Sequence, residues 1–253
     1  MLVDAHAHCD RFGDRTDQAI AQMNHYRILT LGVAMDIPSY LKTVGLAARS
    51  PYLKATFGIH PWEARHYGER LGELDPYLRQ TPLIGEAGLD FFWVEDKTTF
   101  PCQRKVFEYQ CEWAARTGKI MNLHTKGAET DVLSAIRELR LKSPIIHWYS
   151  GPLGLIDAYL SCGCYFTVGV ETLVSEEARR IARAIPFERL LLETDNPGGY
   201  EWLIKIVGMP RLIRDVLGAV AGAKGVGAAQ LEACLTDSWV ALTSGIPELA
   251  APG

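Results

Sequence analysis

The chain has 253 residues, of which 48% are hydrophobic and 22% are charged, and its formal net charge is -4. This length and composition are ordinary for a globular protein with one large domain. A weakly acidic chain without a basic run has no long-range attraction for a polyanion, so any contact with nucleic acid must be local. No stretch approaches the roughly 18 apolar residues of a membrane span. Because Asp4 and His6 stand where a signal peptide carries cationic residues, we expect a cytoplasmic protein.

Short apolar runs rich in Val, Ile and Leu alternate along the chain with longer amphipathic stretches. The apolar runs predict strands at residues 2–8, 27–34, 53–60, 83–89, 120–125, 145–148, 165–170 and 190–195. The amphipathic stretches predict helices at residues 103–117, 131–141, 155–161 and 176–185, each ending near a Gly or Pro. Residues 210–245 are expected to hold an eighth helix and an added helix around 231–242, and the tail 246–253 is expected to be loosely ordered.

Strands that alternate with helices indicate parallel pairing with right-handed crossovers. Two architectures fit this alternation, a closed barrel and a doubly wound open sheet. A Gly-rich phosphate loop after the first strand would favour the open sheet, but residues 6–10 there read HAHCD. We therefore predict an α/β chain folded as a (β/α)8 TIM barrel, with residues 1–253 forming a single domain.

Ionisable residues gather at the C-terminal ends of the predicted strands, where barrel active sites are built. They are His6, His8, His60, Glu86, Asp90, His124, His147, Glu193 and Asp195. Each residue alone is compatible with a structural hydrogen bond. As a set, however, buried imidazoles and carboxylates that converge on one end of a barrel are costly without a cation. The pattern therefore predicts a metal centre.

The first two histidines of this set lie two residues apart on a predicted strand. Because side chains alternate along a strand, the rings of His6 and His8 are expected to point to the same face and to hold one metal together. Asp4 either orients this pair or has a structural partner of its own. Nitrogen and carboxylate donors suit Zn, Mn, Fe or Co and suit Mg less well. The donors suffice for two divalent ions, with Glu86 as the natural bridging carboxylate.

Six stretches carry specific motifs: residues 3–10 (VDAHAHCD), 57–61 (FGIHP), 84–92 (IGEAGLDFF), 122–124 (NLH), 146–151 (IHWYSG) and 192–197 (LETDNP). Together they resemble the TatD family of metal-dependent hydrolases, a part of the amidohydrolase superfamily that includes deoxyribonucleases. The resemblance implies metal ligation by His6, His8, Glu86, His124, His147 and Asp195. It also implies that Asp195 is the general base, that Glu86 is catalytic with it, and that His60 lies near the substrate.

Several positions depart from the family pattern, and two of them lie close in sequence to predicted site residues. Trp62 stands where the family usually has a second histidine, two residues after His60. Lys126 stands two residues after His124, where the family usually has an arginine. A lysine keeps the positive charge but loses the bidentate fork that grips a phosphate. These departures leave the predicted ligand set intact and bear on the substrate.

The residues and the resemblance together predict a divalent-metal-dependent hydrolase. We expect it to cleave phosphodiester bonds as a TatD-like DNase, by metal-bound hydroxide with Asp195 as general base and with Lys126 near a substrate phosphate. The partner would be DNA or another phosphoester substrate. The alternative is an amidohydrolase that opens small amides or lactones on the same metal site, which the acidic charge favours. A non-catalytic metal-binding scaffold is a third reading, and the intact ligand set opposes it. The sequence leaves the oligomeric state open.

Overall fold

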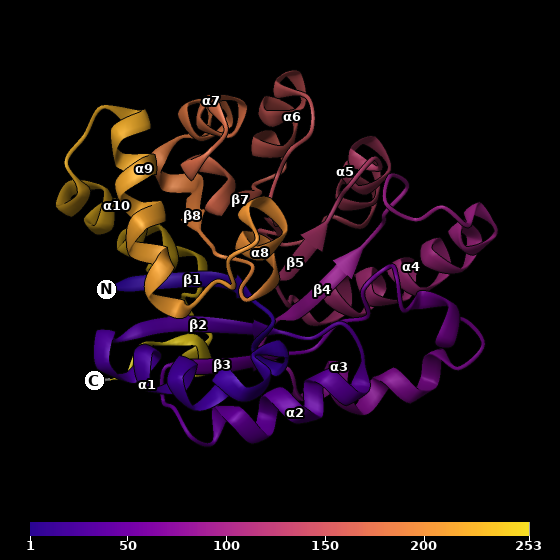
Figure 1. The fold of residues 1–253 in the computed structure, drawn as a ribbon. Coiled ribbons are helices and arrows are strands. Elements are labelled where there is room, and N and C mark those ends of the chain that lie inside the picture. The colour runs from indigo at the N-terminus through magenta and orange to yellow at the C-terminus, as the bar shows by residue number, and fades with distance from the viewer. Residues whose placement is uncertain (253) are drawn as a thin grey trace. The chain divides into compact units, whose positions relative to one another are not determined.

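The computed structural model describes residues 1–252, and each predicted strand is present in it in a shorter form (Figure 1). The strands are β1 (Leu2–Ala7), β2 (Ile28–Val33), β3 (Leu53–Thr56), β4 (Ile84–Gly88), β5 (Met121–His124), β6 (Ile145–Ile146), β7 (Tyr165–Val168) and β8 (Leu190–Leu192). Most of the shortening falls at the C-terminal ends. There the polar residues leave the hydrogen-bonded ladder and enter the loops that follow.

The predicted helices are confirmed with small shifts at their ends. The described chain contains α1 (Thr16–Tyr26), α2 (Ile37–Ala47), α3 (Asp75–Gln80), α4 (Phe100–Thr117), α5 (Glu129–Leu139), α6 (Ile156–Ser161), α7 (Glu176–Ala184), α8 (Gly198–Ile204), α9 (Ile213–Lys224) and α10 (Ala228–Leu242). Helix α4 begins three residues before the predicted start because Pro101 suits the first turn of a helix. Residues 210–245 hold α9 and α10, which Gly225 separates in a left-handed conformation.

Four pairs of neighbouring strands are parallel. They join β1 with β2, β4 with β5, β5 with β6, and β7 with β8. Each of these pairs consists of strands that are consecutive in the chain, with helical residues between them. The chain is therefore an α/β protein with parallel sheets, as its sequence predicts.

The residues group into two compact units, and each unit is assembled from separate segments. The first unit contains Met1–Gly32, Lys42–Ala55 and the chain from Phe166 onward. The second unit contains Val33–Leu41 and Thr56–Tyr165. That the whole chain forms one domain stays a prediction.

In the first unit, the first strand lies beside the last. Ala7 and Asn196 form a parallel bridge, and the backbone N–H of His8 donates to the Asn196 carbonyl at 2.7 Å. Helices α9 and α10 contact both β1 and β8, and Figure 1 shows them next to these strands. The α10 side chains Leu231 and Trp239 are fully buried, so this helix contributes its apolar face to the core.

In the second unit, β4 lies next to β5, and β5 lies next to β6. Helix α4 contacts β4 and α5, and the two helices run along the same side of these strands in Figure 1. Phe57, just after β3, forms a parallel bridge with Ile84 at the start of β4. Val106, Phe107 and Cys111 of α4 are buried here, which fixes the helix against the sheet.

The C-terminal segment 246–253, predicted to be loosely ordered, contains a short turn in its described part. Pro247–Leu249 form a single 3-10 turn, and the Leu249 side chain is fully buried. Burial of this apolar side chain opposes fraying of the segment. Gly253 lies outside the described residues.

No helix of residues 1–252 combines the length and the apolar character needed to span a bilayer. The cytoplasmic location stays a prediction.

Candidate metal centre

Three of the predicted ligands come together in the first unit, and we call His6, His8 and Asp195 the first cluster. His6 lies near the end of β1, and His8 and Asp195 lie in the loops after β1 and β8. Asp195 Oδ1 is 3.7 Å from His6 Nε2 and 3.3 Å from His8 Nε2. The two imidazole rings are nearly perpendicular, with centroids 5.2 Å apart. One donor atom from each residue therefore faces a common point, as the alternation along β1 predicts.

Backbone contacts hold Asp195 in this place. Its N–H donates to the His6 carbonyl at 2.9 Å, so the aspartate is fixed to the same strand that carries the histidines. Its φ of 50° lies in the left-handed region, which Asp and Asn adopt more readily than most residues. The loop after β8 thus turns sharply at the residue whose carboxylate meets the histidines.

Asp4 is buried beneath the first cluster and binds the strand that leads to Asp195. It accepts hydrogen bonds from the Thr194 backbone N–H at 2.9 Å and from Thr194 Oγ1 at 2.6 Å. Burial raises the pKa of this carboxyl to about 7, although the Thr194 bonds work against the increase. Of the two readings of Asp4, these contacts favour the structural one, in which it joins β1 to the residue before Asp195.

A second set of donors comes together in the second unit, and we call His60, Glu86, His124 and His147 the second cluster. Glu86 is on β4 and is almost completely buried. Its Oε1 is 2.9 Å from His124 Nδ1, 3.3 Å from His60 Nε2 and 3.7 Å from His147 Nε2. The carboxylate is therefore the common partner of three imidazoles.

Asp90 also contacts this cluster, although the sequence assigned it neither a metal-binding nor a catalytic role. Its Oδ2 is 3.1 Å from His124 Nε2 and accepts a hydrogen bond from Trp62 Nε1 at 2.8 Å. Its Oδ1 accepts bonds from the backbone N–H groups of Phe92 at 3.0 Å and Trp93 at 2.7 Å. The position of Asp90 at a strand end was a signal for it, but its partners depend on how the loops fold.

The electrostatics of the second cluster favour a positive charge. Burial lowers the pKa of His124, but hydrogen bonds with Asp90 and Glu86 outweigh burial and raise it from 6.5 to about 9. The pKa of Asp90 is held below its usual value, because the His124 and backbone contacts outweigh its burial. Two carboxylates that hold a cationic imidazole between them provide the kind of environment that also stabilises a metal cation.

Both clusters fit a divalent metal by the nature of their donors. Each supplies at least three imidazole and carboxylate groups, of which at least two are buried. The nearest ligand atoms lie within 4.8 Å of one another in His6, His8 and Asp195, and likewise in His60, Glu86 and His124. Sets of three nitrogen and oxygen donors that leave a position open are typical of catalytic zinc and related sites. His60 is predicted near the substrate. Its Nε2 lies 3.3 Å from Glu86 Oε1, so it belongs to the same group of possible metal donors as Glu86 and His124.

Lys126, the other predicted substrate contact, lies among aromatic side chains at the end of β5. Its Nζ donates to Ser150 Oγ at 2.8 Å and lies 5.2 Å from the ring centroid of Phe92 and 5.8 Å from that of Trp93. The ammonium group is therefore held near two aromatic rings in the second unit, and its contact with a substrate stays a prediction.

The backbone around Glu86 tolerates no side chain at Gly58. A Cβ at this position would lie 2.5 Å from the Glu86 carbonyl oxygen. We expect Gly58→Ala to displace the Glu86 backbone and to lower the free energy of unfolding by about 1–3 kcal/mol, because overpacking has this effect in cores. Urea unfolding measures the change. Gly72→Ala, where no atom lies within 4 Å of the new Cβ, is the matched control and should shift stability far less.

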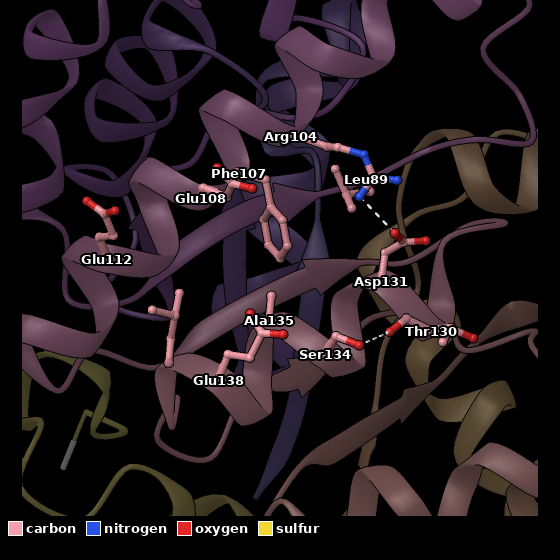
Figure 2. A pocket seen from close by; sticks show the side chains of 11 residues that line it. Leu89, Arg104, Phe107, Glu108, Glu112, Thr130, Asp131, Ser134, Ala135 and Glu138 are labelled. Atoms are coloured by element: carbon pink, nitrogen blue, oxygen red, sulfur yellow. Dashed lines mark hydrogen bonds and ion pairs between the residues drawn. The ribbon is translucent and has the colours of Figure 1, made fainter.

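A cavity of about 440 Å³ lies in the second unit, between α4 and α5 (Figure 2). Arg104 and Asp131 form an ion pair at 2.7 Å beside it, and Glu108, Glu112 and Glu138 line it. The carboxylates outnumber the single basic group, so this cavity is a poor site for a phosphate. None of the predicted site residues lines it.

Comparisons with known proteins identify relatives of the chain. The family model described as TatD related DNase matches residues 3–242. The chain is 37% identical to the 3'-5' ssDNA/RNA exonuclease TatD of Edwardsiella piscicida, over 56% of this chain and 57% of that protein. It is 27% identical to the uncharacterized metal-dependent hydrolase YcfH of Escherichia coli K12, over 96% of this chain and 95% of the relative.

Solved structures give the same picture for the fold. The chain resembles the crystal structure of YJJV, a TatD homolog from Escherichia coli K12, with a TM-score of 0.86 and 21% identity over 95% of this chain and 97% of the other. A TatD family hydrolase from Entamoeba histolytica gives a TM-score of 0.81 at 17% identity, over 95% of this chain and 97% of that one. At these identities the likeness describes the fold alone.

Proposed function

Because the chain belongs to the family of TatD-related DNases, we propose that it cleaves phosphodiester bonds of DNA or a related phosphoester, with two divalent ions. The chain is a metal-dependent hydrolase of this family. The proposed metal ligands are His6, His8, Glu86, His124, His147 and Asp195. The observation that carries the proposal is the convergence of imidazoles and carboxylates, most of them buried, into two clusters whose donors suit divalent cations.

We propose the closed (β/α)8 barrel, as a single domain, for the architecture that supports this chemistry. The bridge between Ala7 and Asn196 supports it, because it sets the first strand beside the last. The bridge between Phe57 and Ile84 supports it as well, because it continues the strand order from the third strand to the fourth. In such a barrel the loops after the strands are the place of an active site.

In the proposed reaction a bound divalent ion supplies Lewis acidity and lowers the pKa of water. Asp195 accepts the proton of the attacking water at a carboxylate oxygen, since its Oδ1 lies beside the two histidines, 3.7 Å from His6 Nε2 and 3.3 Å from His8 Nε2. Glu86 acts with it as the catalytic carboxylate of the second cluster. His60 and Lys126 are proposed to contact the substrate, Lys126 through the charge on its Nζ.

A specific observation keeps one alternative open, the hydrolysis of small amides or lactones on the same metal site. Lys126 is a single point charge that already donates to Ser150 Oγ, and it lacks the two parallel N–H groups with which an arginine grips a phosphate. The net charge of -4 also gives no general attraction for a polyanion.

Turnover of two substrate panels tests the proposal. Chelator-treated protein is reconstituted with Mn²⁺ or Zn²⁺ and assayed with a generic phosphodiester and short oligonucleotides, and in parallel with lactones and N-acyl compounds. Metal-dependent hydrolysis of the phosphodiesters is the expected result. Turnover confined to the lactones or N-acyl compounds would replace the proposal by the alternative. Stoichiometric metal without activity on either panel would favour the non-catalytic scaffold.

Removal of the Lys126 ammonium group should weaken phosphate substrates selectively. We expect Lys126→Ala to lower kcat/KM for a phosphodiester about tenfold, because a hydrogen bond to a charged group is worth about 1.5–3 kcal/mol and this side chain is partly exposed. A neutral ester or lactone should be unaffected. Lys142→Ala, which removes an exposed lysine of the same unit, is the control. An equal loss on neutral substrates would contradict the assigned contact.

A further inference from the structure

Three large aromatic side chains are exposed close to the second cluster. Trp62 is 47% exposed, Phe92 is 63% exposed and Trp93 is 47% exposed. Single exposed apolar residues are normal on protein surfaces, whereas contiguous apolar patches mark interaction sites. We call Phe92, Trp93 and Lys126 the aromatic platform, with Trp62 as its neighbour through Asp90.

The platform combines ring faces with one positive charge. The rings of Phe92 and Trp93 are perpendicular, with centroids 4.8 Å apart, so they present two differently oriented π-surfaces. Lys126 Nζ lies within 5.8 Å of both ring centroids. An ammonium group beside exposed aromatic rings can hold a phosphate while a nucleobase stacks on a ring face.

Asp90 fixes the platform and connects it to the second cluster. Its Oδ1 accepts the backbone N–H groups of Phe92 and Trp93, which sets the turn that carries both rings. Its Oδ2 contacts His124 Nε2. Gln103 also holds the Asp90 backbone, by accepting its N–H at 3.0 Å and donating to its carbonyl at 3.2 Å. The rings are thus placed by the same carboxylate that touches a proposed metal ligand.

From this arrangement we propose that the platform binds the unpaired bases of single-stranded nucleic acid, by stacking on Phe92 and Trp93, while Lys126 contacts a backbone phosphate. The inference rests on the proposed function and names the residues of this chain that would hold the bases and the phosphate of its substrate. Base faces are accessible to an aromatic ring only when the base is unstacked, so a duplex is not a ligand of the platform. A chain with net charge -4 lacks general attraction for a polyanion, which makes such local contacts necessary.

Binding to the metal-stripped protein tests the platform without any contribution from turnover. The probes are a fluorescent eight-residue oligothymidylate and an abasic oligomer of the same length and charge, titrated by anisotropy in the presence of a chelator. The variants are Phe92→Ala, Trp93→Ala and Lys126→Ala. The control is Trp113→Ala, which also removes a ring under a cation, since Arg116 lies 5.4 Å from the Trp113 centroid on α4. Thermal unfolding checks that each variant is folded.

The stacking and charge contacts have different signatures. Phe92→Ala and Trp93→Ala should each weaken oligothymidylate binding roughly 5- to 100-fold and leave the abasic oligomer unchanged. Lys126→Ala should weaken both oligomers and reduce the slope of log affinity against log salt by about 0.7, the value for one phosphate contact on a single strand. Trp113→Ala should change neither.

The outcomes separate the platform from the proposed function. Unchanged oligothymidylate affinity in both ring variants would overturn the platform and leave the hydrolase proposal standing. Equal affinity of the wild type for the two oligomers would also overturn it, because binding would then owe nothing to the bases. A wild type that shows base-dependent binding through these rings but hydrolyses no phosphodiester would support the platform and overturn the proposed reaction.

Discussion

Replacement of Asp195 by Asn is expected to lower kcat for a phosphodiester about 100- to 10,000-fold while most of the bound metal remains. General acid–base catalysis contributes an effect of this size, and an amide does not accept the proton that the carboxylate would take. An oxygen donor still faces His6 and His8 in the variant, so the first cluster keeps three potential ligands. Steady-state kinetics and elemental analysis of the same preparation measure both parts of the expectation.

The matched control for this variant is Asp215→Asn, which neutralises an exposed carboxylate at the start of α9 in the same unit. It should retain full turnover. If Asp195→Asn worked at the wild-type rate, Asp195 would not be the general base. If it lost its metal together with its activity, the aspartate would be a ligand first, and its part in proton transfer would need a separate measurement.

The second large effect is the loss of bound metal expected in His6→Ala and in Glu86→Ala. His6→Ala should remove the ion of the first cluster, because only His8 and Asp195 would remain to bind it. Glu86→Ala should remove the ion of the second cluster, because this carboxylate is the common partner of three histidines. Turnover should fall below detection in both variants. Elemental analysis of the purified proteins gives the number of ions that remain.

His66→Ala is the control, since His66 is half exposed and pairs only loosely with Glu63, at 3.9 Å. It should keep the wild-type metal content. Loss of one ion from each variant is the expected result, and loss of two ions from Glu86→Ala would indicate that Glu86 bridges, as the sequence predicts. Full metal content in both variants would contradict the ligand set altogether. So would a chelated preparation that works undiminished.

The sequence predicted which residues are metal donors at strand ends, because strands and the alternation of their side chains can be recognised from patterns a few residues long. Each predicted strand is present, since a buried parallel strand reads as a short run of Val, Ile and Leu. The alternation of side chains along a strand predicted that His6 and His8 share a face, and both meet Asp195 Oδ1 in the structure. The motifs around Glu86 and Asp195 predicted the family, which the comparison over residues 3–242 confirms.

The partners of the individual side chains were decided by tertiary structure. Asp4 binds Thr194, 190 residues away, and Asp90 joins His124 to Trp62, across separations of 34 and 28 residues. His60 stays a predicted substrate contact, and the fold also places its Nε2 3.3 Å from Glu86 Oε1, 26 positions along the chain. Such contacts depend on the register of neighbouring strands and on the path of the loops between them, and no local pattern encodes either.

The amino-acid sequence by itself determined the kind of chemistry, because imidazole and carboxylate groups at strand ends are costly to bury unless they share a cation. The tertiary structure alone decided which donors meet within each unit and where the exposed rings of Phe92 and Trp93 lie relative to Lys126. The physical reason is that donor type is a property of each residue. The distance between donors, in contrast, is a property of the packed backbone, which only long-range contacts fix.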